Sequence, residues 1–349
     1  KVRGSGGFDG FRLAAANQTV KGLSITGFAQ AVRPASNGAV IQCNYLGLLA
    51  NGTASANDRG VEVYGAGTQI GGLSAGQGNV ISANNIAGIV TTAGTSDTSI
   101  QGNFIGTDPT GLNSRANGTG INHFFGAATW RDITRNLISG NSGTAGIVLE
   151  ADDRITPSNG QIRIQANIIG ANRTLTALMR NGGDGMLFDA NSISGVLIGG
   201  TISAEGNIIT ASDDGIELRT VSNVTIQGNT VALAVARGIA LDNVTSATIG
   251  GAASTQGNSI GGNGGDGIVI RNNSSNVTIT GNFIRPIATI GGTFDNAGHG
   301  ILLDTTSNIT IGNGTAAGRN VIAGNRRRGI TGTGAVSGIS INGNYIGTD

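Results

Sequence analysis

Charged residues recur at two fixed positions around a repeated glycine, and they are the residues of this sequence best suited to chemistry. One row stands directly before the glycine and contains Asp184, Asp214, Arg237, Asp266 and His299. A second row stands four residues after the glycine and contains Asp189, Arg219, Asp242, Arg271 and Asp304. If the chain stacks these segments, each row brings its members together about one strand spacing apart.

Two interpretations of these rows compete. Paired carboxylates can act as general acid and base or can bind Ca²⁺, and a neighbouring arginine can hold an anionic group. The functional interpretation is a groove that binds or cleaves a polysaccharide. Its candidate catalytic residues are Asp184, Asp214, Arg237, Asp266 and His299, and its candidate ligand-binding residues are Arg219, Asp242, Arg271 and Asp304. The structural interpretation is a salt-bridge ladder, and the alternating sign of the second row favours it.

The composition excludes several other classes of function. A net charge of +1 gives no general attraction to nucleic acid. One cysteine excludes a disulfide framework, and no apolar run approaches the roughly 18 residues that membrane insertion requires. Single glycine-rich matches to a Ca²⁺-binding repeat and to a dinucleotide fingerprint occur within 261–268, without the tandem copies or the helix that those motifs need. No cofactor is therefore expected, and Ca²⁺ belongs only to the functional interpretation of the charged rows.

The positions of the charged rows follow from an internal repeat. A glycine followed by an alternating apolar stretch recurs about every 29 residues, as at Gly88-Ile89 and Gly215-Ile216. The apolar period is two, and the runs are short, rich in Thr, Val and Ile, and bounded by turn residues, which indicates strands. Short strands that cannot bury their own face must stack on copies of themselves.

A second repeated element is Asn followed two residues later by Ile, Leu or Val. Its asparagines are Asn44, Asn79, Asn103, Asn136, Asn167, Asn207, Asn229, Asn258, Asn282, Asn320 and Asn344. A side-chain amide offers two donors and an acceptor, so stacked asparagines can bond to one another in a ladder. The sequence thus predicts an all-β, single-domain right-handed parallel β-helix over residues 1–349, with about twelve coils and an internal Asn ladder. Some units carry an insert before the Asn. The others run straight through and several place an aromatic residue after it, at Tyr45, Phe104, Phe283 and Tyr345.

These motifs resemble a known superfamily. The segment Asn103-Phe-Ile-Gly-Thr-Asp-Pro-Thr-Gly111 and the Ile-Gly-Gly…Gly-Asn units are similar to right-handed β-helix repeats of the pectin-lyase-like superfamily, in particular those of large secreted bacterial surface proteins. The resemblance implies the fold. It leaves function open, because that superfamily includes polysaccharide lyases, hydrolases, epimerases, phage tailspikes and adhesins.

One likeness within the superfamily is more specific. Asp213-Asp214 and Gly298-His299-Gly300 are similar to motifs of polygalacturonase-like hydrolases, but here they are about three coils apart and their partner motifs are missing. A patch of Phe124, Phe125 and Trp130 could stack on sugars, although local packing is the simpler explanation.

We therefore expect an extracellular, cell-surface β-helix segment of a longer bacterial protein, structural or adhesive, with polysaccharide or self-association through its end coils as its partner. The alternative is a polysaccharide-acting lyase, hydrolase or epimerase, or a phage tailspike.

Overall fold

The computed structural model describes residues 1–349 except 93–94, 126–131, 152–161, 190–193, 211–212 and 348–349. The chain divides into two compact units. Unit 1 comprises residues 1–163 and 167–183, and unit 2 comprises residues 164–166 and 184–349. Apart from one 3-10 turn, η1 (Ser203–Glu205), every regular element of the described residues is a strand.

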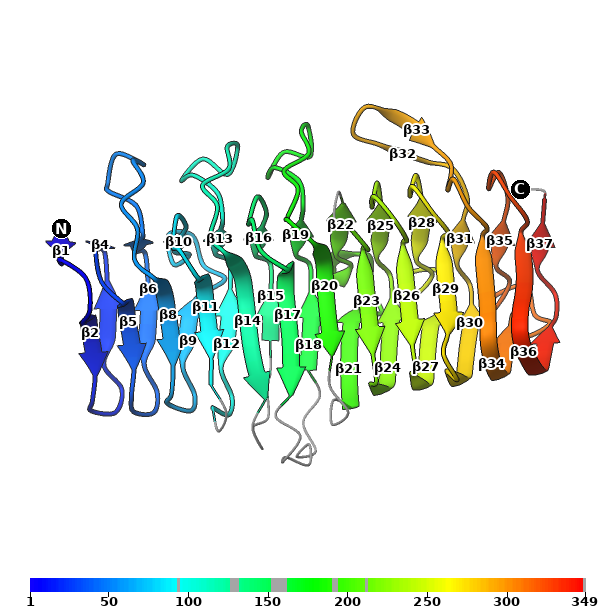
Figure 1. Ribbon diagram of the computed structural model, residues 1–349, viewed down its shortest axis with the longest axis horizontal. Helices are drawn as coiled ribbons and strands as arrows, with labels where there is room; N and C mark the ends of the chain where they lie inside the picture. Colours follow the sequence, from blue (N-terminus) through cyan, green and yellow to red (C-terminus); the bar gives the residue numbers. More distant parts are fainter. Residues whose placement is uncertain (93–94, 126–131, 152–161, 190–193, 211–212, 348–349) are drawn as a thin grey trace. The chain divides into compact units, whose positions relative to one another are not determined.

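Each coil of unit 1 contributes three strands (Figure 1). The first strands, which contain the repeated glycine or its counterpart Ala31, are β2 (Asp9–Leu13), β5 (Gln30–Pro34), β8 (Arg59–Val63), β11 (Ala87–Thr91), β14 (Thr119–Phe125) and β17 (Ala145–Ala151). The second strands are β3 (Thr19–Lys21), β6 (Val40–Gln42), β9 (Gln69–Gly71), β12 (Ser99–Gln101) and β15 (Asp132–Thr134), and β18 (Ile162–Gln165) has residues in both units. The third strands are β1 (Val2–Arg3), β4 (Ser24–Thr26), β7 (Tyr45–Leu46), β10 (Val80–Ile81), β13 (Phe104–Ile105), β16 (Leu137–Ile138) and β19 (Ile168–Ile169).

Unit 2 repeats this pattern. Its first strands are β20 (Asp184–Asp189), β23 (Ile216–Arg219), β26 (Ile239–Asp242), β29 (Ile268–Arg271), β34 (Ile301–Ile311) and β36 (Ile330–Ile341), and the last two continue into the second side of the coil. Its second strands are β21 (Ser194–Gly199), β24 (Ser222–Gln227), β27 (Thr245–Gly250) and β30 (Ser275–Thr280). Its third strands are β22 (Ile208–Thr210), β25 (Thr230–Ala232), β28 (Ser259–Gly261), β31 (Phe283–Ile284), β35 (Val321–Ile322) and β37 (Tyr345–Ile346). A hairpin of β32 (Ile287–Thr289) and β33 (Gly292–Phe294) projects from one coil.

Successive coils pair in parallel, which confirms the predicted parallel β-helix. In unit 1, Ile89 is in register with Val61 on one side and with Ile121 on the other. In unit 2, Ile239 is in register with Ile216 and Ile268. The described residues include twelve first strands, six in each unit, as the predicted coil count requires. That the two units form one continuous domain over 1–349 stays a prediction.

The core is a set of stacked aliphatic residues. The position two after the ladder asparagine is fully buried from Leu46 to Ile322, for example at Ile105 and Ile260. Because each apolar side chain lies on its counterpart in the next coil, burial repeats once per coil, and about 25 cal/mol is gained per Å² of apolar surface removed from water.

The predicted Asn ladder is confirmed in both units. In unit 1, Asn79 Nδ2 donates to Asn103 Oδ1 at 2.9 Å, and Asn103 Nδ2 donates to Asn136 Oδ1 at 3.0 Å. In unit 2 the amides continue from Asn207 to Asn344, each donating to the next. After the first ladder residue of each unit, each Oδ1 also accepts the main-chain N–H of the preceding ladder residue, as Asn103 Oδ1 does from Asn79 at 3.0 Å. These buried amides are thereby satisfied, which removes the penalty of burying polar groups.

A second Asn ladder, which the sequence analysis did not predict, lies at the turn before the first strand. In unit 1 it consists of Asn57, Asn84, Asn117, Asn141 and Asn181, with Nδ2–Oδ1 distances of 2.8–3.0 Å. In unit 2 it consists of Asn263, Asn296 and Asn325, both steps at 2.8 Å. The corresponding residue in the coil before Asn263 is Ala234, whose N–H donates to Asn263 Oδ1. This turn is the one that sets the position of the charged row before the glycine.

Candidate functional site

The second charged row lies along the outer face of neighbouring first strands in unit 2. Asp189 is in register with Arg219, Arg219 with Asp242, Asp242 with Arg271, and Arg271 with Asp304. Ion pairs join Arg219 to Asp189 at 3.4 Å and Arg271 to Asp242 at 2.8 Å. Opposite charges in register on adjacent strands stabilise the pairing by a few tenths of a kcal/mol up to about 1 kcal/mol.

The first row is held by hydrogen bonds from side chain to main chain. Asp184 Oδ1 accepts the N–H of Asp214 at 2.9 Å, and Asp214 Oδ1 accepts the N–H of Arg237 at 2.8 Å. In a later coil, Asp266 Oδ1 accepts the N–H of His299 at 2.5 Å. His299 Nδ1 in turn accepts the N–H of Arg328 at 3.1 Å. Asp and His are suited to this position because each offers an acceptor to the coil that follows.

The structure brings only part of the predicted catalytic set together. Asp214 contacts both Asp184 and Arg237, and the three come from consecutive coils, whereas Asp266 and His299 lie in the coils of β29 and β34. Asp213-Asp214 and His299 are separated by the coils of β26 and β29. The polygalacturonase-like pairing of these motifs is therefore absent from this fold.

Glu217 is the member of the site that the sequence analysis missed. It lies in the middle of β23 and is 3% exposed. Its carboxylate contacts Arg219 Nη2 at 2.7 Å and Arg271 Nη2 at 3.3 Å, and Arg237 Nη2 lies 4.0 Å away. Its register neighbours Leu187 and Ala240 are both apolar. A charged residue between two apolar ones at the same position of the repeat was the available signal.

Three carboxylates meet at this point. The oxygens of Asp184, Asp214 and Glu217 lie within 4.8 Å of one another, and all three residues are buried. Arg237 binds Asp214 through two nitrogens, Nε to Oδ1 at 3.0 Å and Nη2 to Oδ2 at 2.7 Å. A two-point contact of this kind is the strongest form of arginine–carboxylate pair.

Burial dominates the electrostatics of the cluster. It raises the pKa of the Asp184 carboxyl to about 7, against the opposing N–H bond from Asp214, and the negative charges of Glu217 and Asp214 raise it further. Burial also raises the pKa of Asp214, although the guanidinium of Arg237 favours its charged form. Asp184 is the carboxyl here whose charge changes near neutral pH.

The cluster does not fit a Ca²⁺ site. Ca²⁺ takes six to eight oxygen ligands. Both oxygens of Asp214 are bound by Arg237, and both oxygens of Glu217 face arginines. The guanidinium groups of Arg219, Arg237 and Arg271 lie 2.7–4.0 Å from these carboxylate oxygens and would repel a cation bound there. We derive no chemistry through a metal here.

Comparison with known proteins agrees with the fold. Residues 116–284 match the family model described as "Right handed beta helix region", and the predicted right-handed parallel β-helix is confirmed. No curated protein matches the chain.

Several solved structures are similar to it at low identity. The Dettilon tailspike protein is 17% identical with a TM-score of 0.49, covering 92% of this chain, and the chain spans 61% of that protein. The A-module of the Azotobacter vinelandii mannuronan C-5 epimerase AlgE4 is 16% identical with a TM-score of 0.44, covering 96% of this chain and 85% of its own. The periplasmic alginate epimerase AlgG is 13% identical with a TM-score of 0.38, covering 93% of this chain and 70% of its own.

Two remaining expectations concern other parts of the chain. No helix long and apolar enough to cross a membrane occurs in the residues that the structure describes. Of the predicted aromatic patch, Trp130 lies outside the described residues, and Phe124 and Phe125 are described only as part of β14.

Proposed function

We propose that this chain is a structural and adhesive segment of an extracellular bacterial cell-surface protein, and that it holds polysaccharide on its outer face without cleaving it. The observation that carries the proposal is the closure of the carboxylate cluster by arginines. Asp214 and Glu217 are 2% and 3% exposed. A general acid or base must lie within hydrogen-bond reach, about 2.6–3.2 Å, of the group with which it exchanges a proton. The oxygens of these two carboxylates are already paired with arginine nitrogens, so they are not free to contact a substrate.

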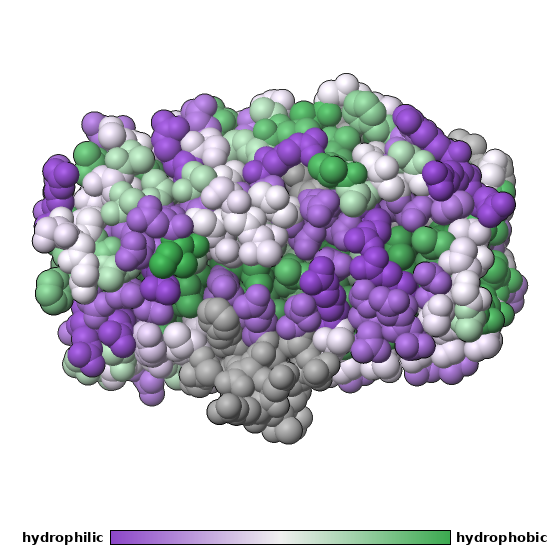
Figure 2. Space-filling model, viewed as in Figure 1, coloured by the Kyte–Doolittle hydropathy of each residue, from purple (hydrophilic) through white to green (hydrophobic). Residues whose placement is uncertain are grey.

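The contact surface in this proposal is the second charged row. The side chains of Asp189 and Arg219 are 46% and 42% exposed, and Arg271 is 29% exposed. Figure 2 shows hydrophilic side chains gathered on the face where Figure 1 places β23, β26 and β29. A guanidinium has five N–H donors, so Arg219 and Arg271 can pair with aspartate and still bind sugar hydroxyl or carboxylate groups, beside Asp242 and Asp304.

Native gels that contain soluble polysaccharides test this proposal. We expect alginate, polygalacturonate or a neutral glucan to retard the chain, with no new reducing ends or unsaturated products after long incubation. Arg219→Gln should weaken the retardation, and Arg319→Gln, an arginine of unit 2 outside the row, should leave it unchanged. Migration unaffected by every polysaccharide would reject the adhesive function.

The alternative is a polysaccharide-acting enzyme, and one observation favours it. Asp184, Asp214 and Glu217 converge within 4.8 Å, and Asp184, with a pKa of about 7, could hold and release a proton near neutral pH. The same incubations decide between the two functions when NMR spectra of the recovered polysaccharide are added, because an epimerase produces neither new reducing ends nor unsaturated products. Turnover that Asp214→Asn abolishes would replace the adhesive proposal with the enzymatic one.

A further inference from the structure

Unit 1 contains a small cavity beside its third strands. Its volume is about 250 Å³, and its lining includes Val80, Phe104 and Pro109 together with three glycines, Gly76, Gly78 and Gly102. Sites for drug-sized ligands occupy roughly 300–1,000 Å³. The cavity therefore suits a single small ring.

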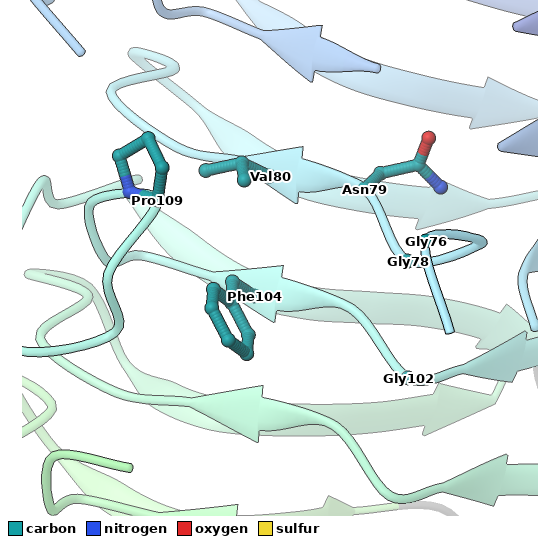
Figure 3. Close-up of a pocket in the computed structure, with 7 residues that line it drawn as sticks. All are labelled: Gly76, Gly78, Asn79, Val80, Gly102, Phe104 and Pro109. Carbon is teal, nitrogen blue, oxygen red and sulfur yellow. The ribbon is translucent and has the colours of Figure 1, made fainter. Parts of the chain in front are cut away.

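The cavity has one apolar end and one polar end. In Figure 3 the side chains of Phe104, Val80 and Pro109 lie toward one end, and Gly76, Gly78 and Gly102 lie toward the other. The N–H groups of Gly76 and Gly78 donate no hydrogen bond to any described residue. Gly76 is exposed and Gly78 is half-buried, so these groups are available to a ligand.

The fold itself keeps this polar end open. Val80 and Phe104 are in register on β10 and β13, which places the aromatic ring directly beside the valine. At Gly78 an added Cβ would meet the carbonyl oxygen of Gly102, so neighbouring coils approach here backbone to backbone. One end of the cavity is therefore lined by glycine backbone, and the other end carries the aromatic ring.

The loop that carries Pro109 is fixed before any ligand arrives. Asp108 Oδ1 accepts the hydroxyl of Thr110 at 2.6 Å, and Asp108 Oδ2 accepts Asn113 Nδ2 at 2.7 Å. A preformed wall lowers the entropy cost of binding. None of the seven lining residues carries a charged side chain, and the guanidinium of Arg173 lies over the Phe104 ring, 5.9 Å from its centre.

We propose that this cavity, formed by Phe104, Val80, Pro109 and the amides of Gly76 and Gly78, binds one neutral hexopyranose ring of a polysaccharide. A pyranose has an apolar C–H face that can lie on the Phe104 ring and a rim of hydroxyl groups that can accept from the two glycine N–H groups. The adenine base of adenosine is bicyclic and larger than the single ring that the volume suits, and a uronate would exchange the hydration of its charge for neutral N–H donors. The inference rests on the proposed function and assigns it a second subsite.

Saturation-transfer difference NMR on the intact chain tests the cavity. The probes are methyl β-D-glucopyranoside, methyl β-D-galactopyranoside and methyl α-D-mannopyranoside, with glucuronate, galacturonate and adenosine as comparisons. We expect at least one neutral glycoside to bind and the uronates and adenosine to bind at least tenfold more weakly. Absence of binding by all three neutral probes, or a preference for a uronate or adenosine, overturns the proposal.

Three variants locate the binding. Phe104→Ala removes the aromatic ring and should weaken binding of the neutral glycoside about tenfold or more. Val80→Phe should fill the cavity while keeping the fold, because its register neighbours Tyr45 and Phe104 are already aromatic. Ile168→Ala, in the same unit on β19, is the matched control and should bind like the wild type. Binding that survives both Phe104→Ala and Val80→Phe excludes this cavity.

These experiments can reject the cavity subsite without rejecting the adhesive function, and the reverse. If the cavity variants bind like wild type while Arg219→Gln still weakens retardation in polysaccharide gels, the adhesive function stands and the subsite falls. If no polysaccharide retards the chain but a neutral glycoside binds at Phe104, the subsite stands without the adhesive row.

Discussion

At the scale of single residues, Glu217 determines how the charges of unit 2 are arranged. Arginines from three coils direct their guanidinium groups to one carboxylate, at 2.7, 3.3 and 4.0 Å. Removing one partner of a buried ion pair is costly because it leaves the remaining charge without compensation. The loss of stability on removing the carboxylate should be larger for Glu217 than for a carboxylate with a single arginine.

Glu217→Gln should lower the free energy of unfolding by about 2–4 kcal/mol, since three arginines lose their shared counter-charge. The matched control is Glu62→Gln, because Glu62 also stands two residues after the repeated glycine, on β8, and has one arginine, Arg59, at 3.7 Å. Glu62 is also buried, so that control should lose less stability than Glu217→Gln because only one arginine loses its counter-charge. Urea unfolding followed by circular dichroism measures both, and equal losses in the two variants would contradict a special role for Glu217.

At the scale of elements, the sequence predicts some features of the coil well and others poorly. Glycine spacing, period-two apolar runs and the motif beginning at Asn103 identified three strands and one Asn ladder. The second ladder was missed because the distance from its asparagine to the glycine varies, being three residues at Asn57 and five at Asn141. The amides still align, because the intervening turn absorbs the extra residues without shifting the strand. A pattern of fixed spacing cannot detect such a ladder.

Asn84→Ala should destabilise unit 1 about as much as Asn103→Ala, by about 1–3 kcal/mol. Asn84 is buried, and its Oδ1 accepts Asn57 Nδ2 at 3.0 Å, so the substitution leaves a buried donor without its acceptor. The adjacent Asn85 is exposed and its side chain donates to Asp58, so Asn85→Ala should change stability by less than about 0.5 kcal/mol. Denaturant midpoints for the three variants test this. A cost at Asn84 no greater than that at Asn85 would show that the second ladder contributes nothing.

At the scale of the whole molecule, buried groups with opposite pH dependence offset one another. Burial lowers the pKa of His123 to about 3, so the unfolded chain binds its proton first and stability rises with pH between about 3 and 6.5. Burial raises the pKa of Asp184 to about 7, so the folded chain keeps that proton and stability falls as pH rises from about 4 to 7. The two slopes nearly cancel across mildly acidic pH. Composition and motif spacing cannot predict this balance, because both shifts depend on burial in the folded chain.

Asp184→Asn should therefore reveal the pH dependence that His123 alone gives to the stability of the fold. An asparagine keeps an Oδ1 that can accept the N–H of Asp214, which Asp184 accepts at 2.9 Å, but it has no proton to lose. The wild type should show a nearly flat stability between about pH 4 and 6.5, and the variant should gain stability steadily over the same range. At pH 8 the variant should exceed the wild type by a few kcal/mol, the order expected for a shift of about three pKa units. Thermal or urea unfolding at pH 4, 5, 6, 7 and 8 measures both profiles. If they run parallel, Asp184 does not hold a proton in the folded chain at mildly acidic pH, and the proton-transfer role that the enzymatic alternative gives this carboxyl is lost with it.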